Sequence, residues 1–304
     1  MTVRFERPVS LAARWARRIG IVSFLVTVAA WGGHRFGPLI TPHLIIFLYG
    51  ASFLAIFAIV LALIGLFRLW QVGAKGGKAC FVALLAVTLP FSIYGFATFQ
   101  MIRKPALYDV STDIADPPQW LIVPDANQYP LPPRPAVTAK DRDAQMKAYP
   151  GLSGRRYEGA IDRILQAVRQ VSSEQGIRVY KDSGLRTSVT AFEQDPAADE
   201  AASDDLEAAP TTGEAPVPTS RPADFTPLPE EIAGVDVEMQ GEAREVVTGL
   251  TFDYLIRLRE EAETTLVDLR VASRYGTHDL GLSAVMAETY LKKLDAVLLG
   301  LAGN

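Results

Sequence analysis

Four charged residues near the C-terminal end alternate with apolar residues in two neighbouring segments. Asp253 and Arg257 lie in the first segment, and Asp268 and Arg270 lie in the second. Successive side chains of a strand point to opposite faces, so these four residues share the face opposite the apolar one. Arginine binds carboxylates and phosphates through paired hydrogen bonds. The pattern predicts a charged face that either holds an anionic or zwitterionic ligand or forms cross-strand ion pairs of small stabilising effect.

The two segments, 252–259 and 264–273, are expected to form a hairpin closed by four residues. In a hairpin, directly paired residues point to the same side of the sheet. Matching apolar residues to apolar residues limits the register to within two residues. A four-residue loop then predicts Asp253 opposite Arg270, and Asp268 opposite a leucine.

Further polar residues follow the second segment, before a predicted amphipathic helix at 283–301. Ser273, His278 and Asp279 have the residue types of a catalytic triad, but an adjacent histidine and aspartate cannot easily orient each other as a triad requires. Asp279 is placed instead to accept hydrogen bonds from amides at the start of the helix. We assign no catalytic residue. The candidate ligand-binding residues are Asp253, Arg257, Asp268, Arg270, Ser273, Arg274 and Asp279.

The sequence lacks the usual signatures of metal and cofactor sites. Its one cysteine, Cys80, lies in an apolar run, and the single histidine of the C-terminal half, His278, has no ligand partners at metal-binding spacing. The chain has no glycine loop that would cradle a phosphate or a dinucleotide. We therefore expect no metal and no cofactor. The acidic C-terminal half also argues against nucleic acid as a partner.

Residues 105–304 predict one soluble α+β domain, in which an antiparallel sheet has helices on one face. Residues 105–135 are rich in proline and are expected to lie as an extended arm along the domain. Residues 194–231 are acidic and poor in apolar residues, so we expect a disordered insertion there. Strands are expected at 177–181, 187–192, 235–247, 252–259 and 264–273, and helices at 156–175 and 283–301.

Residues 1–104 predict an α-helical transmembrane anchor of three spans. Three apolar stretches, at about 19–38, 44–67 and 79–101, approach or exceed the roughly 20 residues that cross a bilayer. Basic residues precede the first stretch and fill the loop between the second and third, which places both flanks in the cytoplasm. The domain then lies outside the cytoplasm. A cleaved signal peptide is the alternative to the first span, and it leaves the domain on the same side.

The C-terminal half contains the motifs Val-Asp-Leu-Arg-Val-Ala-Ser-Arg-Tyr-Gly at 267–276, Asp-Leu-Gly at 279–281, Asp-Val-Ser-Thr-Asp at 109–113, Pro117-Pro118 and Tyr149-Pro150. Together these motifs resemble those of the domain of unknown function 1499 family. The resemblance covers residues 107–301, and it departs from the family pattern at the acidic insertion and at His278 and Ser283. It implies a bacterial or plastid-type membrane or envelope protein without an established activity.

These features favour a multi-pass protein of the bacterial inner (plasma) membrane, with a cytoplasmic N-terminus and a periplasmic or otherwise extracytoplasmic domain. The first hypothesis is non-catalytic binding of an envelope protein or of a small polar or lipid-derived ligand. The second is a hydrolase or transferase that acts on cell-envelope material through Asp253, Asp268 or Asp279, which requires a concave site with a strongly shifted pKa. The third is a membrane assembly factor that acts through its helices.

Overall fold

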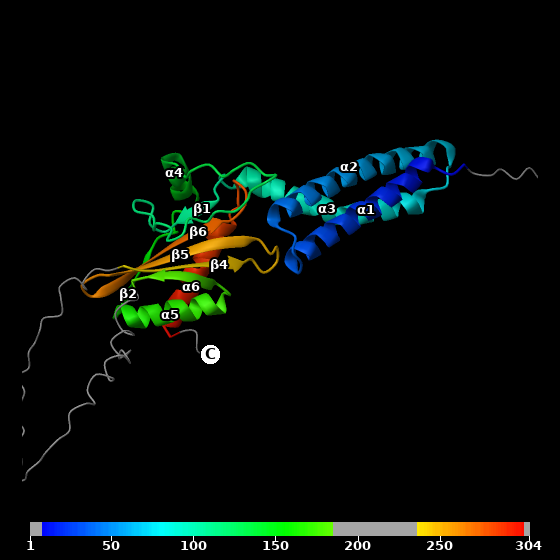
Figure 1. Ribbon diagram of the computed structural model, residues 1–304. Helices are drawn as coiled ribbons and strands as arrows, with labels where there is room; N and C mark the ends of the chain where they lie inside the picture. Colours follow the sequence, from blue (N-terminus) through cyan, green and yellow to red (C-terminus); the bar gives the residue numbers. More distant parts are fainter. Residues whose placement is uncertain (1–7, 185–235, 301–304) are drawn as a thin grey trace, which may run out of the picture.

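The computed structural model describes residues 8–184 and 236–300, which form a bundle of three long helices and a separate α+β domain (Figure 1). The predicted strand at 187–192 and the predicted acidic insertion at 194–231 lie outside the described residues. The bundle comes first in the chain, and its third helix leads directly into the domain.

The bundle consists of α1 (Leu11–Arg35), α2 (Thr41–Val72) and α3 (Gly77–Arg103). Pro42 suits the first turn of α2, and Gly73, with a φ of 63°, ends the helix in a left-handed conformation. Among the described residues, α2 and α3 are long and apolar enough to cross a membrane, and α1 does not meet the same criterion. Two of the three predicted spans are therefore supported by length and composition.

The first helix differs from the other two because its charge-free run is short. Arg17 and Arg18 lie in its first half and His34 and Arg35 end it, which leaves only residues 19–33 between them. At 1.5 Å per residue this run is about 22 Å long, less than the ~30 Å of hydrocarbon in a bilayer. The helix also ends before the predicted limit at residue 38, where Pro38 disfavours helix for the residue before it.

Small side chains line the contacts between the three helices, and large apolar side chains face outward. The buried positions of α1 recur every three or four residues, which places them on one stripe that packs against α2 and α3. Helices that pack in lipid use this arrangement, because close backbone approach stabilises them where burial of apolar surface cannot. The buried residues of α1 are Ala13, Ala16, Gly20, Ser23, Thr27, Ala30 and His34.

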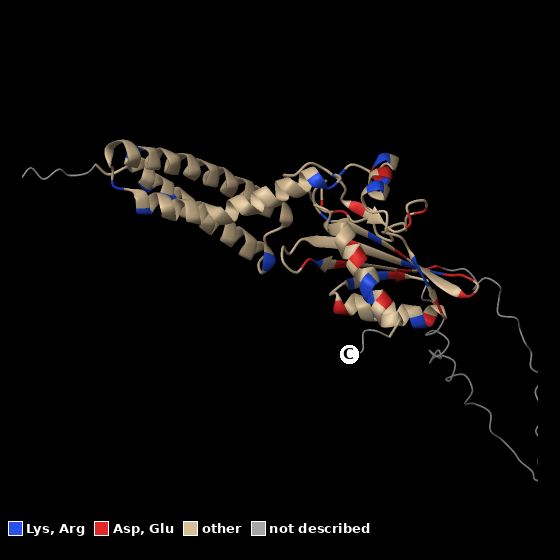
Figure 2. Cartoon of the chain, turned by 180° about the vertical axis from the view of Figure 1, so that it is seen from behind, with Lys and Arg blue, Asp and Glu red and all other residues tan. Residues whose placement is uncertain are grey.

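The start of α1 and the loop between α2 and α3 lie at the same end of the bundle. The backbone N–H of Lys75 donates to the carbonyl of Pro8 at 2.8 Å, and the N–H of Ser10 donates to the carbonyl of Lys75 at 3.1 Å. The domain follows Arg103 at the opposite end (Figure 1). Figure 2 shows that the middle of the bundle is free of charged residues and that basic residues mark its ends.

The domain is built on one antiparallel sheet of six strands in the order β1-β6-β5-β4-β3, with β2 paired to β6 beyond β1. β1 and β2 follow each other along the outer edge of β6, so the longest hairpin, β5–β6, lies at the centre. The strands are β1 (Asp109–Ser111), β2 (Arg155–Glu158), β3 (Arg178–Ser183), β4 (Val237–Arg244), β5 (Thr251–Glu260) and β6 (Thr264–Ser273).

Two helices cover one face of the sheet, as the sequence predicted. α5 (Ile161–Glu174) and α6 (Leu282–Leu298) pack on the apolar side chains of β5 and β6. The buried hydroxyl of Tyr290 shares a hydrogen bond with the Ser172 hydroxyl at 3.1 Å and donates to the carbonyl of Val168 at 3.1 Å, so the two helices are also joined by polar contacts. The core includes Ile164, Val168, Val171, Phe252, Tyr254, Ile256, Leu258, Val267, Leu269, Val271, Tyr290, Leu291 and Leu294.

Two elements differ from the sequence prediction. The predicted helix at 156–175 begins only at Ile161, because the residues before it form β2 against the edge of β6. Within the described residues β3 pairs with β4, and its predicted partner at 187–192 lies outside them. A short helix, α4 (Ala139–Ala148), was not predicted.

The hairpin register was wrong by two residues, although the assignment of faces was right. Asp253 pairs with Ala272 instead of Arg270, and Asp268 pairs with Arg257 instead of a leucine. The cause is the turn, since β5 continues through Glu260 and the N–H of Glu261 closes the hairpin on the carbonyl of Thr264. The shift preserves the alternation and places an arginine directly opposite an aspartate.

Candidate functional site

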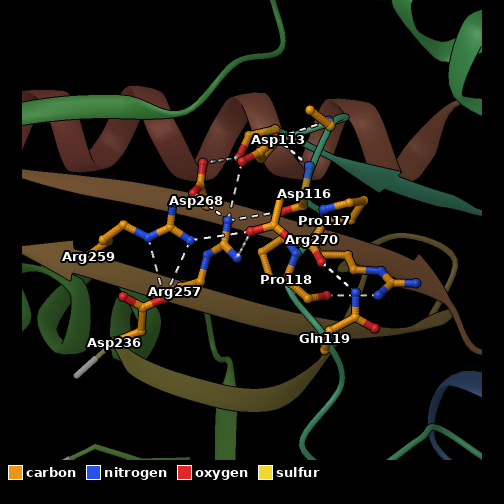
Figure 3. A network of polar contacts seen from close by, with 12 residues as sticks. Asp113, Asp116, Pro117, Pro118, Gln119, Asp236, Arg257, Arg259, Asp268 and Arg270 are labelled. Atoms are coloured by element: carbon orange, nitrogen blue, oxygen red, sulfur yellow. Dashed lines mark hydrogen bonds and ion pairs between the residues drawn. The ribbon is translucent and has the colours of Figure 1, made fainter. Parts of the chain in front are cut away.

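The face of the sheet that α5 and α6 leave uncovered is crossed by the arm, the segment between β1 and α4 (residues 112–138; Figure 3). Gln240, fully buried on β4, fastens the arm through both atoms of its amide group. Its Nε2 donates to the carbonyl of Ile122 at 2.6 Å, and its Oε1 accepts from the Ile122 N–H at 2.9 Å. The proline-rich segment therefore lies along the domain, as its sequence predicted.

Arg257 is the centre of the polar contacts under the arm. Its Nη2 donates to the carboxylate of Asp268, its partner across the hairpin, at 3.0 Å. The arm supplies two further carboxylates, Asp116 at 3.0 Å from Nη1 and Asp113 at 3.3 Å from Nη2 (Figure 3). The side chains of Arg257 and Asp268 are only 5% and 3% exposed. Arg257, Asp268, Asp113 and Asp116 thus form an ion cluster whose central pair, Arg257 and Asp268, is buried rather than solvated.

A close backbone approach leaves no room for a side chain beside Asp268. A Cβ added to Gly154 would lie 2.5 Å from the Asp268 carboxylate oxygen, well inside contact distance. We expect Gly154→Ala to lower the free energy of unfolding by about 1–3 kcal/mol, because the buried ion cluster must shift. Gly151→Ala is the matched control, since a Cβ there meets nothing within 4 Å, and it should change stability by less than about 0.5 kcal/mol. Equal urea midpoints for the two variants would contradict this interpretation.

Asp109 of β1 is held between two arginines. Arg270 approaches its carboxylate with Nη2 at 2.8 Å and Nε at 3.1 Å, and Arg142 of α4 approaches it at 3.3 Å. The remaining nitrogen of Arg270 donates to the carbonyl of Pro118 at 2.8 Å, and its guanidinium lies 4.8 Å from the ring centre of Trp120. Arg270 is therefore already bound to protein groups on both of its edges and on its face.

Asp253 lies fully buried at the other end of the same face. Arg274 binds its carboxylate through Nε and Nη2, and its Nη1 contacts Glu242 at 2.5 Å. Burial raises the pKa of the Asp253 carboxyl, and the hydrogen bonds from Arg274 act against this rise. Asp253 and Arg274 thus form a second buried ion pair, separate from the cluster around Arg257.

The predicted polar residues after β6 have structural partners. Asp279 accepts the backbone N–H groups of Gly281 and Ser283 at 2.8 Å each, so it caps the start of α6 as predicted. The Ser273 hydroxyl donates to the carbonyl of Tyr275 at 2.9 Å, and Nδ1 of His278 accepts the N–H of Leu280 at 2.9 Å. Among the described residues, no hydrogen bond joins this serine to this histidine.

Removing the cap of α6 should weaken the domain. We expect Asp279→Ala to lower the free energy of unfolding by about 1–2 kcal/mol, because two amides at the helix start lose their acceptor. Asp162→Ala is the control: Asp162 is an exposed carboxylate in the first turn of α5 and should contribute only a few tenths of a kcal/mol. Urea unfolding measures both variants, and an Asp279→Ala domain as stable as the control variant would rule out the capping role.

A hollow of about 780 Å³ lies between the arm and the sheet edge near Ala272. Its charged wall includes Arg134, whose Nη1 donates to the carbonyl of Ser273 at 2.7 Å and whose Nη2 donates to that of Pro124 at 2.9 Å. Its guanidinium stacks 5.3 Å from the ring centre of Tyr108. The other lining residues include Asp109, Trp120, Tyr129, Leu131, Pro133 and Arg270.

A protein-family model described as "Protein of unknown function (DUF1499)" matches residues 109–294. The chain belongs to the DUF1499 family. The match extends from β1 into α6, so it covers the sheet, the arm and the hollow, as the resemblance of the motifs predicted. No curated protein and no solved structure matches the chain.

The sequence did not predict that the hollow of this DUF1499 domain would form. Arg134, Trp120 and Tyr108 are far from the charged hairpin in the chain, and only the docked arm brings them beside Arg270. One signal was present, since Arg134 is the single basic residue of the proline-rich stretch 105–135. A lone arginine among prolines and aromatic residues is a candidate for ligand contact.

Within the part of the DUF1499 domain that the structure describes, no group of three or more His, Cys, Asp or Glu residues is arranged to hold a metal ion. The seven predicted ligand-binding residues divide into three groups. Arg257 with Asp268 and Arg274 with Asp253 form buried ion pairs, Ser273 and Asp279 bind backbone groups, and Arg270 alone lines the hollow.

Proposed function

We propose that this protein is a multi-pass membrane protein whose DUF1499 domain lies outside the cytoplasm and binds a small, anionic, lipid-derived or otherwise amphipathic ligand in the hollow under the arm. The proposal is non-catalytic. It rests on the observation that Arg134 lines the hollow and forms no ion pair with a described residue, whereas the arginines of the charged face are paired with carboxylates.

The packing of α1 supports three spans rather than two. Its small-residue stripe fills the contacts with both other helices. On its outward side, the apolar side chains of Phe24, Leu25 and Val28 are exposed. Removal of α1 as a signal peptide would expose the small residues of α2 and α3 that it covers. The arginines near its start have side chains long enough to reach the headgroups from a short span.

The arrangement of the ends supports an extracytoplasmic domain. The basic start of α1 lies at the same end as the α2–α3 loop, as the backbone hydrogen bond between Ser10 and Lys75 requires. Lys75 is in this loop, and Arg68 and Lys78 are in the adjoining turns of α2 and α3. Basic flanks remain in the cytoplasm. The domain, at the opposite end, then lies outside the cytoplasm, in the periplasm of a bacterium with two membranes.

The hollow has the size and chemistry of a ligand site. Its volume falls within the roughly 300–1,000 Å³ of small-molecule pockets, and its walls combine aromatic residues with polar ones such as Asp125, Asn127 and Gln128. In the described part of the chain, Arg134 forms no ion pair, and its guanidinium retains N–H groups beyond the two that bind carbonyls. An anionic group would bind there, with an apolar body against Trp120 and Leu131.

We give less weight to a hydrolase or transferase. General acid–base catalysis needs a carboxylate that reaches the substrate. Asp253 and Asp268 are buried beneath the arm and ion-paired, and both carboxylate oxygens of Asp279 accept backbone amides. These contacts favour a stabilising role for the three carboxylates over a role in proton transfer. An assembly role for the helices has no contact in its favour, because their outward apolar side chains suit lipid equally well.

Binding of hexyl phosphate, a soluble anionic amphiphile, tests the proposal. We expect saturable binding to the full chain in lipid nanodiscs, and Arg134→Ala should weaken it about tenfold or more because a charge-assisted hydrogen bond is lost. Trp120 reports binding directly once the other tryptophans, Trp15, Trp31 and Trp70, are replaced by Phe, a background we call Trp120-only.

Two controls accompany this measurement. Arg156→Ala removes an exposed arginine that pairs with Glu261 away from the hollow, and it should leave binding unchanged. Hexyltrimethylammonium carries the same alkyl chain with the opposite charge and should not compete. Equal affinity of the Arg134→Ala variant, or equal binding of both amphiphiles, would refute the proposed role of the hollow.

A further inference from the structure

The turn between β4 and β5 is a rigid tip that presents two valines to the outside. The N–H of Glu245 donates to the carbonyl of Leu250, and the N–H of Gly249 donates back to the carbonyl of Glu245, both at 2.9 Å. The Glu245 carboxylate also accepts the N–H of Val247 at 3.0 Å. With the backbone fixed in this way, Val246 and Val247 are 77% and 68% exposed.

This valine tip, residues 245–250, packs against the last turn of α1. The indole N–H of Trp31 donates to the carbonyl of Val247 at 3.0 Å, and Nε of Arg35 donates to the carbonyl of Val246 at 3.1 Å. Gly249 allows the approach: its φ is +77°, and a Cβ there would lie 3.3 Å from Cδ of Arg35. The helix thus binds the backbone of the tip and leaves its apolar side chains free.

The hydrogen bonds from Trp31 and Arg35 fix the position of the two valines along the length of the bundle. Trp31 and Arg35 are four residues apart, so the tip spans the last ~6 Å of α1. Tryptophan and arginine at a helix end mark the boundary between hydrocarbon and headgroups. The apolar surface of the bundle continues around this end in Phe36, 79% exposed, and in Ile40 and Ile102. The valines are therefore level with side chains that face lipid.

We propose that the valine tip inserts into the interfacial layer of the outer leaflet and gives the domain a second contact with the membrane besides α3. The inference rests on the proposed membrane placement of the bundle, and not on a ligand in the hollow. The occupant is lipid, because the exposed valines continue the outward apolar surface of α1 and α3. The N–H groups of Val247, Thr248, Gly249 and Leu250 already have acceptors within the tip, which lowers the cost of placing its backbone in an interface.

Fluorescence quenching by nitroxide-labelled lipids tests this contact in the full chain. Cys80 is replaced by alanine, and Val247→Cys carries an environment-sensitive fluorophore in vesicles of phosphatidylethanolamine and phosphatidylglycerol. We expect blue-shifted emission and at least about twofold quenching by nitroxides near the headgroup. Met146→Cys on α4, an exposed apolar position of the domain with no bundle contact among the described residues, should show neither effect.

A label at a third position distinguishes the contact of the tip with lipid from the placement of the bundle in the membrane. Phe53→Cys lies on the outward side of α2 and should be quenched by nitroxides deep in the acyl chains. Quenching at Phe53 without quenching at Val247 would overturn the tip contact and leave the membrane placement intact. Absence of quenching at Phe53 would overturn both. A blue shift at Val247 that nitroxide lipids do not quench would identify a protein contact and would also overturn the proposal.

Discussion

Replacing Arg257 by alanine should destabilise the domain by about 3–5 kcal/mol, because it leaves Asp268 charged, buried and without its main partner. The Asp268 side chain is 3% exposed, and the arm carboxylates Asp113 and Asp116 lose the same guanidinium. The arm should also loosen, since its carboxylates hold it to the sheet. Urea unfolding of the Trp120-only background measures the loss directly, because Trp120 lies on the arm.

Arg259→Ala is the matched control for this result. Arg259 is two residues further along the same strand and also contacts Asp116, at 3.3 Å, but its side chain is 37% exposed. An exposed pair contributes at most about 1 kcal/mol. A second variant, Arg257→Met combined with Asp268→Leu, should recover part of the loss because no lone charge remains. Similar unfolding curves for Arg257→Ala and Arg259→Ala would show that the cluster is not the support we describe.

Arg274→Ala should have an effect of similar size, about 3–5 kcal/mol, for an independent reason. Asp253 has no exposed surface, and Arg274 is the group that binds its carboxylate within the described chain. Arg178→Ala is the control, since Arg178 shares Glu242 with Arg274 but is itself largely exposed. Thermal or urea unfolding should show a large loss for the first variant and a small one for the second.

The pH dependence of the Arg274→Ala variant provides a sharper test. Burial already raises the pKa of Asp253, and Arg274 is the main group that lowers it, so its removal should raise that pKa further. The folded state then binds a proton more tightly than the unfolded state, and stability rises as the pH falls. The loss of unfolding free energy in Arg274→Ala, relative to the unmodified chain, should therefore become smaller as the pH falls from about 7 to about 5. In Arg274→Ala with Asp253→Asn, this dependence should disappear, and a deficit independent of pH in the single variant would contradict the assignment.

The alternation of residues predicted the faces of the sheet correctly because the periodicity of a strand is a local property. Phe252, Tyr254 and Ile256 alternate with Asp253 and Leu255, and the structure places the two sets on opposite sides. The register was wrong by two residues because it depends on the turn. Glu260 had to be assigned to the loop or to the strand, and its sequence neighbourhood of acidic residues favoured the loop.

The parts that the sequence did not predict depend on contacts between distant segments. The helix α4 has no apolar periodicity, and its main signal was Thr138 followed three residues later by Asp141, which cap each other in the structure. The strand β2 is short and takes its conformation from the edge of β6. The arm reaches its place through Gln240 and Arg270, two residues more than 100 positions away, so no local pattern revealed the hollow.

The position of the arm changes how the charged face is interpreted. The sequence left two possibilities for it, ligand contacts or ion pairs on a partly solvated surface. The structure shows ion pairs, but buried ones, because the arm brings its own carboxylates to Arg257 and lays Trp120 over Arg270. Ligand recognition in our proposal moves to the outer side of this layer, where Arg134 faces the hollow.

The proposed function depends first on the side of the membrane that the domain occupies, and a fusion of alkaline phosphatase after Asn304 tests this most directly. The enzyme folds to its active form only outside the bacterial cytoplasm, so we expect full activity in intact cells from a full-length fusion in the membrane fraction. An inactive phosphatase, together with bright fluorescence from green fluorescent protein fused at the same residue, would place the domain in the cytoplasm and contradict the account.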